Sequence, residues 1–109
     1  MEPRELCEKD VRRAVLAFRV TLVSQLEPLR EIPVILEHPS VPPAVTQEAI
    51  QELPQYIERT RSTLDELREV EQYADARGIK IRSWEHLNDA EAVLETATIA
   101  VWEKLDEQL

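Results

Sequence analysis

The chain has 109 residues, a single glycine, a single cysteine and a net charge of −9. Its 43% hydrophobic and 32% charged residues exclude a disordered chain and are typical of one globular or coiled-coil helical domain. Hairpin turns, bulges and phosphate-binding loops are usually built on glycine. We therefore predict an all-α fold, a compact helical bundle that forms one domain over residues 1–109.

The negative charge lies mainly in the second half of the chain. Residues 46–77 carry eight acidic and four basic side chains, and residues 78–109 carry seven and three. Proteins that bind nucleic acids place lysine and arginine against the phosphate backbone, so this balance argues against direct nucleic-acid binding. A basic protein partner is easier to accommodate.

Three features bear on the cellular compartment. Cys7 has no second cysteine to pair with, which excludes an intramolecular disulfide and indicates a reducing compartment. Residues 1–9 are polar and charged, unlike a secretory signal. The longest apolar run, residues 14–23, contains Arg19 and is too short to cross a bilayer. We expect a cytoplasmic protein with no membrane segment.

The first predicted helix covers about residues 5–26, which contain no proline or glycine. Apolar residues recur on one side at helical spacing: Val11, Ala14, Val15, Phe18, Leu22 and Leu26. The opposite side is also apolar, because Leu16, Val20 and Val23 lie there. Either this is a central helix that packs inside the bundle on two sides, or its second side is an interface with a partner or a second copy.

Five of the seven prolines fall within residues 28–43, so we predict a proline-rich connector there. A short helix over residues 28–36 and an extended segment over residues 32–36 are alternative conformations for its first part. We expect the rest to be an irregular loop over Val34, Ile35 and Leu36.

Thr46 is a plausible N-cap for the following helix. A heptad-like seam then runs through Ile50, Leu53, Ile57, Thr60, Leu64 and Leu67. Because Pro54 interrupts this pattern, we expect either a kink or two helices, over residues 47–53 and 54–77, the second being a long central helix. Gly78 stands where a residue of left-handed conformation would end it.

After Gly78, alternation predicts a short extended connector with Ile79 and Ile81 on its buried side. A last helix is predicted over about residues 83–107, with Ser83 able to cap its first turn and Asn88 and Glu91 in capping-box spacing. Its seam is formed by Leu87, Ala90, Leu94, Ala97, Val101 and Leu105, and Trp102 lies off it.

The residue types that carry out catalysis are sparse. His38 and His86 are the only histidines, and neither belongs to the Glu-x-x-His pair of metal sites in helical bundles. Acidic neighbours surround Cys7 and oppose a reactive thiolate. We predict no enzyme activity, no cofactor and no metal.

The only basic cluster of the acidic half brackets Gly78 and consists of Arg77, Lys80, Arg82 and Trp84. These residues could contact an acidic partner or an anion. The alternative is that they are basic residues of the kind that commonly follow a helix, attracted by its dipole.

The run from Phe18 to Leu26 resembles the first helix of caspase-recruitment domains, in which an arginine precedes a Leu-Val-x-x-Leu pattern. The later stretch is similar in order to the third and fourth helices of that family: residues 46–53, then Arg59, Arg61, Leu64 and Leu67 before Arg77 and Gly78. The resemblance covers about residues 10–78. It implies a six-helix death-fold adaptor that binds like domains through charged patches. The prolines, the long helix before Gly78 and the additional last helix depart from the pattern.

Two classes of function follow from these patterns. The first is a non-catalytic helical protein–protein interaction module that self-associates, with Leu16, Val20, Val23 and the Arg77 to Trp84 cluster as contact residues. The second is an acidic inhibitor or antitoxin-like regulator that occupies the nucleic-acid cleft of a basic partner. High salt would leave an apolar interface intact and would weaken acidic mimicry steeply.

Overall fold

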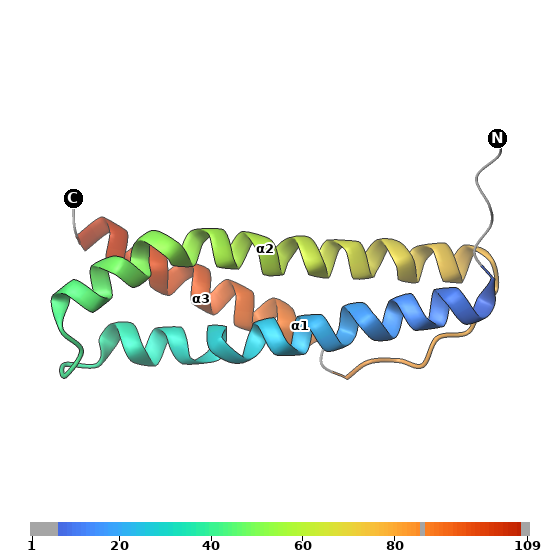
Figure 1. The fold of residues 1–109 in the computed structure, drawn as a ribbon, viewed down its shortest axis with the longest axis horizontal. Helices are drawn as coiled ribbons and strands as arrows, with labels where there is room; N and C mark the ends of the chain where they lie inside the picture. The colour runs from blue at the N-terminus through green and yellow to red at the C-terminus, as the bar shows by residue number, and fades with distance from the viewer. Residues whose placement is uncertain (1–6, 86, 108–109) are drawn as a thin grey trace.

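The computed structural model describes residues 7–85 and 87–107, and these form an all-α bundle of three helices, as the sequence predicts. The helices are α1 (Glu8–Glu37), α2 (Pro43–Ala76) and α3 (Leu87–Glu107). Figure 1 shows α1 and α2 as a long antiparallel hairpin, with α3 crossing the half of it that contains the α1–α2 turn. The molecule is 53 Å long and 17 Å thin. Each helix packs against both others, so none is a central helix enclosed by the rest.

The predicted proline-rich connector is wrong in extent, because α1 continues through Pro28 and Pro33 to Glu37. Only residues 38–42 form the loop to α2. An interior proline costs a helix about 3 kcal/mol, whereas each fully buried leucine or isoleucine contributes roughly 1.5–3 kcal/mol. Beyond Pro28, α1 buries three further side chains against the core, and this burial outweighs the prolines: Leu29, Ile32 and Leu36.

Contacts between α1 and α2 support the helix where the first proline disturbs it. The hydroxyl of Tyr56 on α2 donates a hydrogen bond of 3.1 Å to the backbone carbonyl of Gln25. Pro28 has no N–H for the carbonyl of Ser24, and the Tyr56 bond to the next residue holds this turn of α1 against α2.

Of the two alternatives expected at Pro54, a kink or a division into two helices, the division is wrong, since α2 is one helix with that proline inside it. It begins four residues earlier than predicted, at Pro43. The first N–H groups of a helix have no intrahelical acceptor, so a proline at this position removes no hydrogen bond. Thr46 therefore lies within the first turn and is not the N-cap; its hydroxyl donates to the carbonyl of Pro42 at 3.4 Å.

The predicted role of Gly78 is confirmed. It has φ +68° and follows Arg77, the C-cap residue of α2. The N–H of Gly78 donates to the carbonyl of Asp75 at 3.1 Å, and that of Ile79 donates to Ala74 at 2.9 Å. These two bonds form a Schellman motif, which satisfies carbonyls that the helix end leaves free.

The connector from α2 to α3 (residues 77–85) is non-helical, as expected after Gly78. Ile79 and Ile81 are partly buried, and Lys80 and Arg82 are exposed, which confirms the alternation. The start of α3 at Leu87 corrects the prediction of a helix from Ser83. The proposed capping side chain of Asn88 lies outside the described side chains, and Asn88 itself is the second residue of α3.

The core is formed by the predicted seams of the three helices, and Thr60 is its one buried polar residue among those described. The Thr60 hydroxyl donates to the carbonyl of Tyr56 at 3.0 Å, so its burial leaves no unpaired group. Of the predicted seam residues, four are only partly buried: Ala14, Phe18, Leu53 and Leu105. The side chain of Leu87 is outside those described. No described helix is long and apolar enough to cross a membrane.

Candidate protein interface

The outer face of α1 carries three exposed apolar side chains, Leu16, Val20 and Val23. They are 62%, 61% and 46% exposed. Their spacing of four and three residues places them on the same side of the helix, opposite the side that buries Val15 and Leu22. Within the described residues no element covers them, so the prediction of a helix packed on two sides inside the bundle is wrong.

Charged residues extend this face at both ends. Lys9 and Arg13 precede the apolar residues, and Glu27 and Glu31 follow them. At 100° per residue all four point within about a sixth of a turn of the apolar stripe. All four are exposed, and none of them forms an ion pair within residues 7–85 and 87–107. The outer face therefore has a basic end, an apolar middle and an acidic end.

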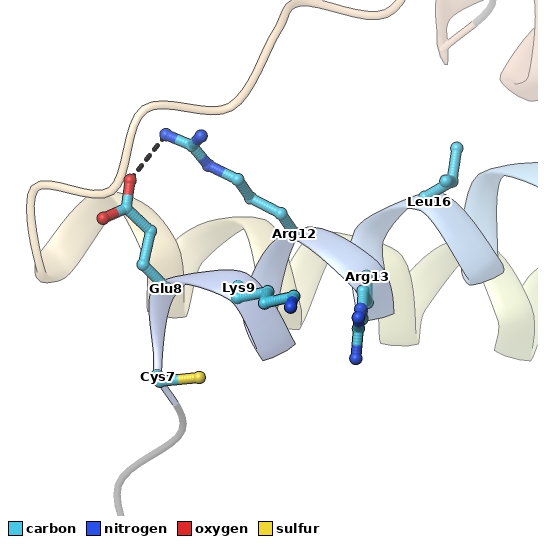
Figure 2. A pocket seen from close by; sticks show the side chains of 6 residues that line it. All are labelled: Cys7, Glu8, Lys9, Arg12, Arg13 and Leu16. Atoms are coloured by element: carbon cyan, nitrogen blue, oxygen red, sulfur yellow. Dashed lines mark ion pairs between the residues drawn. The ribbon is translucent and has the colours of Figure 1, made fainter.

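The neighbouring arginines differ because their charges are already paired. Arg12 bonds to Glu8, one turn earlier in α1, at 2.6 Å, and Arg30 pairs with Asp89 on α3. Figure 2 shows Arg12 reaching toward Glu8 while Arg13 projects away from that pair. Among the described residues, Lys9 and Arg13 are therefore the cations of this end that remain available to a partner.

The first turns of α1 form an open hollow of about 610 Å³, shown in Figure 2. Its lining combines three basic side chains with Glu8, Cys7 and Leu16: the basic ones are Lys9, Arg12 and Arg13. The Cys7 thiol is exposed and donates to the carboxylate of Asp10 at 3.0 Å. The hollow is open and does not enclose a substrate. It connects a basic surface to an apolar one, which suits the docking of a protein.

The predicted basic cluster around Gly78 is divided in the structure. Arg77 lies over the ring of Tyr73 on α2, with 3.5 Å between the guanidinium carbon and the ring centre. Lys80 is exposed, and Trp84 is partly buried against the core. Arg82 lines a hollow of about 370 Å³ together with Trp84, but Arg77 and Lys80 do not.

That hollow contains charges of both signs. Arg19 of α1 bonds to Glu71 of α2 at 3.3 Å and also lies over the ring of Trp84. Asp75 and Arg82 complete the charged lining. The charges of the two arginines and the two carboxylates cancel, so this hollow is not a basic site for an anion. Trp84 packs against the core there.

Sequence reasoning missed several exposed apolar side chains. Val34 is 66% exposed and lies 18 residues, or five helical turns, after Leu16 on the same side of α1. Neither alternative for residues 28–36, a separate short helix or an extended segment, continues α1, and Val34 is expected beneath the following loop; its place on the outer side of α1 corrects this expectation. Ile99 and Trp102 make a second exposed apolar pair, on α3, of which only Trp102 was recognised as lying off the seam.

The described residues contain no group of three metal-ligating side chains. His38 accepts a hydrogen bond from the backbone N–H of Ser40, and His86 lies outside the described residues. Comparison with protein-family models, curated proteins and solved structures finds no significant match. The resemblance to caspase-recruitment domains therefore stays a prediction; it implies six helices, and residues 7–85 and 87–107 form three.

Proposed function

We propose that this protein is a non-catalytic interaction module that self-associates through the outer face of α1. The observation that carries the proposal is the exposure of Leu16, Val20 and Val23 on consecutive turns of one regular helix. An apolar patch rimmed by charged residues is characteristic of protein-binding surfaces. Covering it removes apolar area from water at about 25 cal/mol per Å².

The packing behind this face favours binding. The opposite side of α1 buries Val15, Leu22 and Leu26 against the core, which fixes the helix before a partner arrives. Docking on a preformed helix orders only side chains, and Val20 and Val23 are stiff at χ1. The entropy lost on association is correspondingly small.

The chemistry of the chain supports a non-catalytic role in a reducing compartment. Some exposed acids of the helices form ion pairs with arginines, as Glu91 of α3 does with Arg68 of α2. Cys7 is exposed and unpaired, which favours the cytoplasm over an oxidising compartment. We propose no cofactor for this module.

Sedimentation velocity over about 5–200 μM, the range of weak association, tests the proposal on the wild type and Val20→Lys. We expect the wild type to dimerise with rising concentration and Val20→Lys to stay monomeric, because a buried, unpaired ammonium is costly. Ile99→Lys is the matched control, since Ile99 is 50% exposed on the outer side of α3. A monomeric wild type, or equal dimerisation of Val20→Lys, would contradict the proposal.

A further inference from the structure

We infer that the partner of the outer face of α1 is the same face of a second copy, with the two helices antiparallel. The inference rests on the proposed function and adds the orientation and the charge contacts. It is carried by the order of unpaired groups along the face: Lys9 and Arg13, then the apolar stripe, then Glu27 and Glu31.

The positions of these charges are symmetric about Val20. Arg13 lies seven residues before it and Glu27 seven after, and Lys9 and Glu31 lie eleven residues away on either side. At 1.5 Å per residue, the inner charges are each about 10 Å from Val20 along the axis and the outer ones about 16 Å. A two-fold axis at Val20 therefore brings both cations of each copy beside both carboxylates of the other.

The antiparallel arrangement also closes the apolar middle. Val20 meets Val20 of the second copy at the axis. Val23 lies three residues after Val20, so it lies beside Ala17 of the second copy, which is three residues before that copy's Val20. A small residue opposite a larger one allows close approach of the two helices. A symmetric contact of this kind is isologous and stops at the dimer.

A parallel pair would have the opposite electrostatics. It would place Arg13 beside Arg13 and Glu27 beside Glu27, and like charges in juxtaposition disfavour association. The dipole of α1 does not account for this charge order either, since Glu27 lies ten residues before the end of the helix and the dipole acts within the last turn.

Charge reversal in the full-length chain tests the inference. Lys9→Glu with Arg13→Glu makes both ends of the face acidic, and Glu27→Lys with Glu31→Lys makes both basic. Each double variant disrupts four intermolecular pairs, so we expect its dimer dissociation constant to rise at least about tenfold. The quadruple variant recreates the complementarity in reverse, and we expect it to return to within about threefold of the wild type.

Disulfide trapping tests the orientation independently, in a Cys7→Ser background. In the antiparallel dimer, two copies of Arg13→Cys place their cysteines about 21 Å apart along the axis, beyond the reach of a disulfide. A mixture of the Arg13→Cys and Glu27→Cys proteins places the two different cysteines side by side. We expect crosslinked dimer in the mixture and little in either protein alone.

The outcomes separate this inference from the proposed function. If Val20→Lys abolishes the dimer but the quadruple variant stays as weak as the double variants, or each cysteine variant crosslinks alone, the interface stands and the antiparallel arrangement is overturned. If Val20→Lys leaves the dimer intact, or the wild type is a monomer throughout, the proposed function fails as well. Helical content by circular dichroism confirms that each variant is folded.

Discussion

The guanidinium carbon of Arg19 lies 5.6 Å from the centre of the Trp84 ring, which links the middle of α1 to the connector before α3. The same guanidinium bonds to Glu71 on α2 at 3.3 Å. One side chain thus joins α1, α2 and the connector before α3. The indole face and the carboxylate both attract the guanidinium, so the two contacts hold the Arg19 side chain in one place.

This arrangement predicts a stability loss for Arg19→Met. The Arg19 and Glu71 side chains are only 16% and 25% exposed, so removing the cation leaves a mostly buried carboxylate without its partner. We expect unfolding to become easier by about 1–3 kcal/mol in urea titrations. Arg12→Met is the control: the Arg12 and Glu8 side chains are 54% and 59% exposed, and such a pair contributes less than about 1 kcal/mol. Equal effects of the two substitutions would contradict a structural role for Arg19.

Two leucine truncations should separate the core from the outer face. Leu67 on α2 is fully buried, so Leu67→Ala removes packed contacts and leaves a cavity, which costs about 2–5 kcal/mol. Leu16→Ala is expected to change the stability of the monomer by less than about 0.5 kcal/mol, because Leu16 is exposed. Thermal unfolding at low micromolar concentration measures both. A large loss in Leu16→Ala under those conditions would show that Leu16 is covered within the monomer.

Pro28→Ala should stabilise the protein. Alanine restores the N–H that can bond to the carbonyl of Ser24 within α1, and Pro28 is exposed, so little packing is lost. Removing the proline relieves about 3 kcal/mol of helix penalty, and the less restricted unfolded chain takes back up to about 1 kcal/mol, which leaves a net gain of about 2–3 kcal/mol. Urea unfolding followed by circular dichroism measures the change. A loss of stability would show that the chain at Pro28 is not helical.

The double variant Lys80→Glu with Arg82→Glu tests the remaining part of the predicted basic cluster. Both side chains are exposed and form no ion pair with the described residues, so we expect a change in stability below about 1 kcal/mol. Dimerisation through α1 should also be unaffected. Loss of dimer in sedimentation would instead place the connector in the interface.

Much of the fold could be read from local patterns. The buried sides of α1, α2 and α3 follow the predicted seams through Leu22, Leu64 and Leu94, because helical periodicity depends only on the order of residues. The end of α2 at Gly78 was equally accessible, since a left-handed residue after a helix is most often glycine.

The prolines show where local rules fail. Pro28, Pro33 and Pro54 each carry a local penalty, and the sequence contains no measure of the burial that opposes it. In the bundle, Ile32 and Leu36 pack against residues of other helices, and that burial keeps the helix continuous. The outcome was decided by contacts between residues far apart in the chain.

The outer face of α1 shows the same division. By itself the sequence determined that Leu16, Val20 and Val23 share one side of a helix, because 100° per residue is a property of the backbone. Only the tertiary structure decided that this side is open and that Lys9, Arg13, Glu27 and Glu31 remain unpaired beside it. Whether an apolar side chain is covered depends on which other helices pack against it, and that depends on the free energy of the whole assembly of helices.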